Sequence, residues 1–139
     1  MSWTVAETRD IETCLAIRNA VFVVEQGIAL EDDVDGRDEQ ALHILLSVND
    51  EPVGTARILV SDRTAKIGRV AVLKAHRGGG HGKSIMREAV ALARRNGLSK
   101  AKLGAQVEAV GFYEDLGFSP EGEEFLDAGM PHLLMTMAL

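Results

Sequence analysis

The chain has 139 residues, 46% hydrophobic and 26% charged, a composition that excludes a disordered protein and leaves room for one domain around a single core. Its 21 acidic and 15 basic side chains give a net charge of −6, which offers no general attraction to nucleic acid or to an anionic membrane. No apolar run reaches the roughly 18 to 20 residues of a membrane span, and the first residues lack the features of a secretory signal, so we expect a cytoplasmic protein.

The first elements expected along the chain are a strand and a helix. Residues 2–7 alternate enough for a strand, and Asp10 is a suitable N-cap for a helix that ends near Gln26 and Gly27. One face of that helix carries Ile11, Leu15, Arg18 and Phe22. Because Cys14 lies among apolar side chains, we expect it to be a small buried residue rather than a nucleophile, and a single cysteine excludes an internal disulfide.

A run of charged side chains follows over residues 31–39. It is too charged to pack, so we expect a solvated loop. The run also mimics part of a calcium loop, because acids occupy alternate positions and Gly36 stands sixth. The twelfth position is Leu42, however, where a bidentate glutamate is required, so no metal site is expected.

The middle of the chain is expected to form a meander of strands. Strands are indicated over residues 41–48 and 52–60, and residues 49–51 form a hairpin-like turn between them. Residues 61–64 then turn the chain into a third strand over residues 66–73.

Helices and strands alternate in the C-terminal part. We expect a helix over residues 84–96, a strand over 100–107, a short helix over 108–116, extended structure from Phe118, and a last strand over 133–138 after a turn at 129–131. Gly97 and Gly117 are suited to close the two helices, Gly97 as a left-handed cap. The whole chain, residues 1–139, is therefore expected to be one α+β domain of about seven strands and three or four helices.

A glycine-rich loop separates the strand over residues 66–73 from the amphipathic helix over 84–96. The loop reads Arg77, Gly78, Gly79, Gly80, His81, Gly82, Lys83 and Ser84. Backbone N–H groups at a helix start have no intrahelical partner and carry the positive end of the helix dipole, and glycines leave them open to an anion. The loop therefore predicts a phosphate cradle.

The spacing of the glycines limits which class of phosphate-containing ligand the loop can bind. A P-loop would need glycine where Arg77 stands, and a dinucleotide fingerprint fails because its last glycine would fall on Lys83 or Ile85. The pattern Arg-x-x-Gly-x-Gly, read as Arg77, Gly80 and Gly82, resembles the pyrophosphate signature of the GNAT acyl-CoA N-acyltransferases.

A second segment strengthens this resemblance. Residues 110–118 look like the second GNAT signature, in which Tyr113 on a short helix is followed by Leu-Gly-Phe. Residues 21–26 and 124–132 resemble the small bacterial ElaA/YjcF-like branch of the superfamily, so the similarity spans nearly the whole chain.

The resemblance implies a fold, a cosubstrate and a set of contacts. The fold would be the GNAT fold, a mixed, mostly antiparallel sheet with a splayed central pair of strands, and the cosubstrate would be acetyl-CoA. The pantetheine would pair with the strand before the loop, with the acyl carbonyl near Val72, and Gln106 stands where many relatives have an asparagine. The cofactor contacts it implies are Val70, Ala71, Val72, Arg77, Gly78, Gly79, Gly80, His81, Gly82, Lys83, Ser84, Gln106, Phe112 and Tyr113. A homodimer is common in the family.

The implied reaction needs a general acid, and the sequence contains several candidates for a general base. Tyr113 would protonate the departing thiolate, since a phenol with a pKa near 10 stays protonated at neutral pH; it could instead be a core aromatic. The strand before the loop has no carboxylate, which leaves Glu25 at the end of the first helix as the candidate base, unless that helix end is merely solvated.

The histidines are the other candidates for a base. His43 is expected in the core, His76 and His81 exposed beside the loop, and His132 near the acceptor. Water could also carry the proton away.

Two arginines stand inside apolar strands. Arg57 and Arg69 either pair with Glu25 or Asp35, or hold a carboxylate or phosphate of the acceptor together with His132. We favour the structural pairing.

The resemblance thus predicts acetyl transfer from acetyl-CoA to a primary amine of a small molecule by direct attack in a ternary complex. One alternative is a non-catalytic acyl-CoA-binding regulatory protein, and another is a nucleotide-binding P-loop module.

Overall fold

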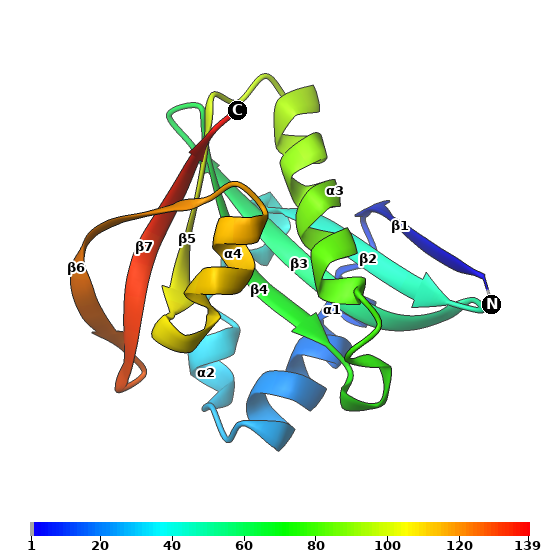
Figure 1. Cartoon of the computed structure of the whole chain (residues 1–139). Helices are drawn as coiled ribbons and strands as arrows, with labels where there is room; N and C mark the ends of the chain where they lie inside the picture. The colour runs from blue at the N-terminus through cyan, green and yellow to red at the C-terminus, as the bar shows by residue number, and fades with distance from the viewer. Residues whose placement is uncertain (1) are drawn as a thin grey trace.

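Seven strands form one mixed sheet in the order β1-β2-β3-β4-β5-β7-β6, in a computed structural model that describes residues 2–139 (Figure 1). The strands are β1 (Trp3–Thr8), β2 (Leu42–Val48), β3 (Glu51–Ser61), β4 (Thr64–Val72), β5 (Lys100–Gln106), β6 (Ser119–Asp127) and β7 (Met130–Ala138). Every neighbouring pair is antiparallel except β4 and β5, which run parallel. The predicted α+β class and the mixed, mostly antiparallel sheet are confirmed.

Helical segments cover both faces of this sheet (Figure 1). They are α1 (Ile11–Arg18), η1 (Asn19–Glu25), α2 (Leu30–Asp33), η2 (Asp38–Gln40), η3 (Lys74–His76), α3 (His81–Arg95), η4 (Val107–Ala109) and α4 (Val110–Asp115). Helix α3 buries Ile85, Met86 and Ala89 in the main core, whereas α1 and η1 bury Ile17 and Val21 in a second cluster on the other face. Within residues 2–139, no helix is both long and apolar enough to cross a membrane.

The first helix begins and ends where the sequence predicts, but its second half is wider than an α-helix. Asp10 caps it, accepting a hydrogen bond of 3.1 Å from the Thr13 amide. After Arg18 the chain continues as the π-helical η1, and Gly27, with φ of +72°, ends it. As predicted, Cys14 is buried inside this layer.

Strands β4 and β5 pair over only three residue pairs. The pairs are Thr64 with Lys100, Ala65 with Ala101, and Lys66 with Lys102. Beyond Lys66 the two strands diverge, although β4 stays paired with β3 as far as Val72. The central pair is therefore splayed, as the resemblance implied.

The prediction of a solvated loop over residues 31–39 is wrong. Leu30–Asp33 form the short helix α2, and Asp33 and Asp38 are buried, at 3% and 7% exposure. Buried carboxylates need partners, and arginines from α1 and β3 supply them. The density of charge along the chain does not show that Arg18 and Arg57 pair with these aspartates in the folded protein.

Among the element boundaries that differ from the prediction, two are explained by local backbone conformation. Helix α3 begins at His81 rather than residue 84, since Gly80 serves as its N-cap with φ of +83°. Strand β7 begins at Met130 rather than residue 133, since Ala128 and Gly129, both with positive φ, make the turn.

Candidate active site

The glycine-rich loop wraps the start of α3 and leaves backbone donors open. Gly78 and Gly80 have φ of +85° and +83°, conformations that side chains with a Cβ rarely adopt. The first hydrogen bond into the helix runs from the Ser84 amide to the Gly80 carbonyl, at 3.1 Å. The amides of residues 81–83 precede that bond, so they point toward the loop as helix N-terminal donors.

A cavity of about 430 Å³ adjoins these donors. Its lining residues come from β4, the loop and α4: Val70, Val72, His76, Arg77, Gly78, Gly80, His81, Gly82, Lys83 and Phe112. A Cβ added at Gly78 or Gly80 would meet no atom within 4 Å, and one at Gly82 would meet only Phe112, at 3.6 Å. The space beside the loop is therefore open to a ligand, and a phosphate can approach the backbone there.

Five of the residues expected at the cofactor do not line this cavity. They are Ala71, Gly79, Ser84, Gln106 and Tyr113. Ser84 donates its hydroxyl to the Gly80 carbonyl at 3.2 Å, within its own helix turn. Gln106 lies at the end of β5, opposite His132 on β7.

A β-bulge at Arg69 explains why Ala71 is turned away. Gly68 pairs with Arg57 and Ala71 pairs with Thr55, so β4 has one residue more than β3 in this stretch, and Arg69 has φ of +52°. Before the bulge, Ala65 and Ile67 face α3; after it, Val70 and Val72 face α3 and the cavity, whereas Ala71 packs against α1 and η1.

Arg77 is held by three hydrogen bonds. It donates from Nε to the Val72 carbonyl at 2.9 Å and from both terminal nitrogens to the Glu25 carboxylate, each at 2.6 Å. The hydrogen bonds from Arg77 lower the pKa of Glu25. A carboxylate with a lowered pKa is a weaker base, so the geometry does not favour Glu25 as the base expected from the sequence.

Tyr113 lies on α4 beneath the cavity wall. Its ring makes edge contacts with Phe112 and Phe118, with centroids 5.0 and 6.3 Å apart. Burial raises the pKa of its hydroxyl, which keeps the phenol protonated at neutral pH. Tyr113 is thus both packed in the core and a potential proton donor.

Arg57 is engaged by carboxylates and does not face an open groove. Its side chain is 4% exposed and donates to Asp35 at 2.8 and 2.9 Å and to Asp38 at 3.2 Å. Burial would lower its pKa, but the hydrogen bonds to Asp35 and Asp38 outweigh it and raise the pKa. The pairing with Asp35 that we favoured is present, which weighs against a role of Arg57 in holding an acceptor.

Arg69 joins the same group from the bulge. It donates to the carbonyls of Asp33 and Asp32 at 3.2 and 3.1 Å and lies 3.3 Å from the Asp33 carboxylate. Its pKa is lowered, first by burial and then by repulsion from Arg57. Arg69 therefore ties the bulge to α2, and its side chain is about a quarter exposed.

Arg18 completes what we call the arginine–aspartate cluster, which consists of Arg18, Asp33, Asp35, Asp38, Arg57 and Arg69. Arg18 is 1% exposed and donates to the carboxylates of Asp33 and Asp38 at 3.1 and 2.6 Å. The pairing of Arg18 with Asp33 and Asp38 was not predicted from the sequence. The available signal was Arg18 itself, a cation at helical spacing from Leu15 and Phe22 on the buried face of the first helix.

The four histidines are scattered. His43 is buried as expected, and one ring nitrogen lies 2.7 Å from the Asp38 carbonyl. His76 and His81 are half-buried rather than exposed and line the cavity. His132 lies on β7, where its Nδ1 contacts the Met130 carbonyl at 2.8 Å and its ring lies beside Phe125.

Comparison with known protein families gives one clear match. The model of the acetyltransferase (GNAT) domain matches residues 16–139, which is most of the chain.

Individual relatives agree with this family. The N-acetyltransferase YjcF of Bacillus subtilis (strain 168) is 40% identical over 120 residues, covering 86% of each chain. The protein ElaA of Escherichia coli (strain K12) is 40% identical over 128 residues, covering 88% of this chain and 83% of ElaA. The crystal structure of Escherichia coli ElaA superposes with a TM-score of 0.84 over 98% of both chains, at 34% identity. An acyl-CoA N-acyltransferase of Pseudomonas aeruginosa superposes with a TM-score of 0.87 over 99% of both chains, at 30% identity. The resemblance seen in the sequence is confirmed.

Proposed function

Because this chain belongs to the GNAT acetyltransferase family of transferase enzymes, we propose that it transfers an acetyl group from acetyl-CoA to a primary amine of a small molecule, by direct attack in a ternary complex. One observation carries the proposal: a glycine cradle at the start of α3 and the open edge of β4 border the same cavity.

The cradle supports binding of the donor. The amides of residues 81–83 and the side chain of Lys83 offer positive charge to a diphosphate, and the left-handed Gly78 and Gly80 keep side chains away from it. Strand β4 beyond Lys66 has no β5 partner, so its backbone groups are available to the amides of the pantetheine. Val70 and Val72 present apolar surface to the same cavity. A crystal structure of a Thermoplasma acidophilum N-acetyltransferase in complex with coenzyme A shares this fold, with a TM-score of 0.75 at 16% identity.

Tyr113 is the proposed acid. In the reaction an amine attacks the thioester carbonyl, and coenzyme A leaves as a thiolate that needs a proton. The raised pKa of Tyr113 keeps its proton in place at neutral pH, and its helix borders the cavity through Phe112. The hydroxyl has no hydrogen-bond partner elsewhere in residues 2–139, so it is available to the departing sulfur.

The proton of the attacking amine is proposed to leave through water rather than through Glu25. The Glu25 carboxylate is held by Arg77 and has a lowered pKa, and β4 carries no acidic residue. A nucleophilic amine can also enter as the small neutral fraction present at neutral pH, which needs no dedicated base.

Two measurements test the proposal together. Calorimetric titration with acetyl-CoA should show binding in the micromolar range, and release of free thiol should depend on adding a primary amine from a broad panel. Binding without thiol release from any amine would favour the alternative, an acyl-CoA-binding regulatory protein. Stabilisation by ATP with magnesium, but not by acetyl-CoA, would contradict both readings.

A further inference from the structure

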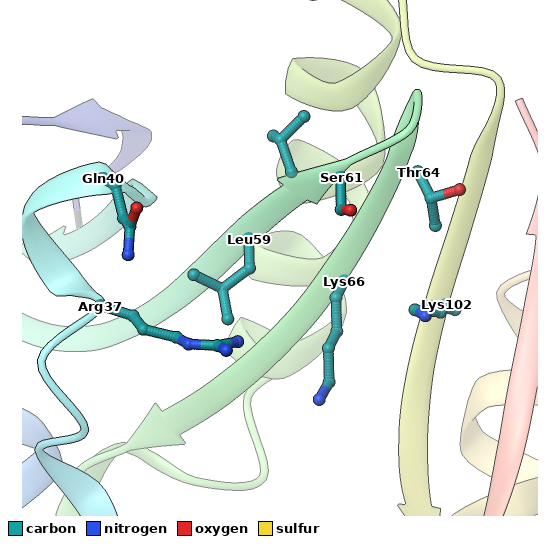
Figure 2. Close-up of a pocket in the computed structure, with 8 residues that line it drawn as sticks. Arg37, Gln40, Leu59, Ser61, Thr64, Lys66 and Lys102 are labelled. Carbon is teal, nitrogen blue, oxygen red and sulfur yellow. The ribbon is translucent and has the colours of Figure 1, made fainter.

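A second cavity lies away from the glycine cradle and is lined by cations. It encloses about 430 Å³ between the loop before η2 and strands β3, β4 and β5. Arg37 reaches across it toward Lys66, and Lys102 projects from the neighbouring strand (Figure 2). Gln40, Ser61 and Thr64 add neutral hydrogen-bonding groups around the same space.

Lys66 and Lys102 are direct cross-strand partners. They form the last residue pair that joins β4 to β5 before the strands diverge. The preceding pair, Ala65 and Ala101, is fully buried in the core under α3, so both lysines lie on the opposite face of the sheet. Like charges directly opposite each other in a sheet destabilise it, and an anion between them would relieve that cost.

The chain supplies no such anion itself. In the described residues none of the three cations has a carboxylate within 4 Å, and no acidic residue lines the cavity. This contrasts with Arg18, Arg57, Arg69 and Arg77, each of which has a carboxylate partner. In a chain of net charge −6, a cavity with three cations and no acid is a local reversal of the overall field.

We propose that this cavity is a second anion site, which takes a compact oxyanion of two or more negative charges, such as a phosphate, diphosphate or polycarboxylate group. Lys66 and Lys102 clamp it from adjacent strands, and Arg37 contributes a fork of donors from the other wall. The site goes beyond the proposed function, because it neither contains nor adjoins the glycine cradle.

The site lies on the same strand as the cavity beside the glycine cradle but on the opposite face of the sheet. Lys66 precedes Val70 and Val72 by four to six residues on the same strand, which corresponds to roughly 13–20 Å along β4. The anion could therefore be a group at the far end of an elongated acceptor, or a separate effector bound at the vertex of the splayed strands. Both kinds of ligand present the same type of anionic group to the site, but they have different effects on enzyme kinetics.

The binding test uses inorganic pyrophosphate as the probe, with the glycine cradle blocked by saturating CoA. Calorimetry at low salt should show one pyrophosphate bound to the wild type. Lys66→Gln and Lys102→Gln should each weaken it at least about tenfold, because each removes one charge of the clamp and keeps a side chain of similar length. Arg94→Gln, which removes an exposed cation from α3, is the matched control and should leave binding unchanged.

Stability gives an independent readout. Without pyrophosphate, Lys66→Gln should melt at a higher temperature than the wild type at low salt, because the repulsion across the strand pair is gone. With pyrophosphate, the wild type should gain more in melting temperature than the variant does.

Kinetics then identify the source of the anion. If pyrophosphate competes only with phosphate-bearing acceptors, the site binds the phosphate group of the acceptor. If pyrophosphate changes the turnover of a neutral amine, the site binds a separate effector. The proposal is overturned if the wild type, Lys66→Gln and Lys102→Gln bind pyrophosphate equally well. It is also overturned if the wild type binds no pyrophosphate at concentrations up to about 10 mM. Failure of CoA to bind in the same titration would contradict the proposed function instead.

Discussion

Glu25 and Arg77 lie 52 residues apart in the chain and are joined by two hydrogen bonds of 2.6 Å. The bidentate pair connects the end of η1 to the loop before α3, and Arg77 lines the cavity. Arg77 also donates its Nε–H to the Val72 carbonyl, so three of its five N–H groups are engaged, and a phosphate that binds the other two would lie close to the Glu25 carboxylate.

Replacing Glu25 with Gln should therefore improve CoA binding and leave the chemistry intact. The variant loses the charge that competes with phosphate for Arg77, so the Kd for CoA should fall by up to about tenfold, equivalent to about 1.4 kcal/mol. Calorimetry and the pH dependence of kcat/KM measure both effects. Glu12→Gln, an exposed glutamate on α1, is the control. A loss of turnover of about 10² with unchanged Kd would restore Glu25 as the base.

A side chain at Gly82 should obstruct the cradle without straining the backbone. Gly80 has a positive φ, so valine there would disturb the loop itself, whereas Gly82 sits in the first turn of α3 with no positive φ. We expect Gly82→Val to weaken CoA binding more than about tenfold, with little change in melting temperature. Gly111→Ala, where an added Cβ meets nothing within 4 Å, controls for the loss of a helical glycine. Parent-like CoA affinity in a folded Gly82→Val protein would remove the cradle from the mechanism.

Tyr113→Phe should reduce turnover and leave donor binding nearly unchanged. The phenylalanine keeps the edge contacts with Phe112 and Phe118 and removes only the hydroxyl. The loss of a general acid predicts a fall in kcat of about 10² to 10³. Single-turnover measurements should be used so that chemistry limits the rate. Turnover within twofold of the parent would make Tyr113 a structural residue.

Arg57→Gln should cost stability rather than substrate preference. Asp38 is 7% exposed and would lose one of its two arginine partners, while Asp35 would lose both short hydrogen bonds from Arg57. Removing one member of a buried ion pair costs about 3–5 kcal/mol, and partial exposure of Asp35 places the expected loss at the lower end, measured by urea unfolding. Remaining folded enzyme should show equal kcat/KM changes for matched charged and neutral amines. A loss confined to the charged amine would instead place Arg57 at the acceptor.

Acid should destabilise the protein through the same cluster. The pKa of Asp35 is lowered chiefly by its hydrogen bonds to Arg57; for Asp38, burial acts to raise the pKa but the arginines outweigh it. Both groups thus have folded pKa values below the ordinary 3.8. The unfolded chain takes up protons first, so their stabilisation is present above about pH 4 and is lost as pH falls through the folded values.

The measurement is urea unfolding from pH 7 down to acid. Asp35→Asn should flatten the loss of stability below about pH 4, because it removes a group that titrates differently in the two states. Asp50→Asn changes an exposed acid in a turn and should keep the parent slope. An unchanged acid slope in Asp35→Asn would show that other carboxyls control acid unfolding.

The sequence predicted features that depend on local pattern. Apolar runs separated by turn residues located the meander of β2, β3 and β4, and the positive φ of Gly97 at the end of α3 follows from its place after an amphipathic run. The cradle was predictable because glycine spacing and helix start are adjacent in the chain. These are short-range properties.

What the sequence did not predict depends on contacts between distant residues. The bulge at Arg69 reverses the alternation of β4, and no residue type marks that reversal, so the sequence does not show that the Ala71 side chain packs against α1 and η1. The burial of Asp33 and Asp38 requires arginines from α1 and β3 to meet, and the pairing of Glu25 with Arg77 requires η1 to reach the loop. The pattern of charges along the chain does not show which distant residues form ion pairs in the folded protein.

Only three residue pairs between β4 and β5 join the two parts of the sheet by strand pairing. Strands β1 to β4 pair with one another along most of their lengths, apart from local bulges, as do β5, β7 and β6, while only the stretch from Thr64 to Lys66 pairs the two parts. Native-state hydrogen exchange should therefore find that amides of β5, β7 and β6 open together, at a lower free energy than those of β2 and β3. A ligand that spans the divergent strands would slow that exchange, so the break in pairing that is proposed to admit the pantetheine also determines how independently the C-terminal part of the sheet unfolds.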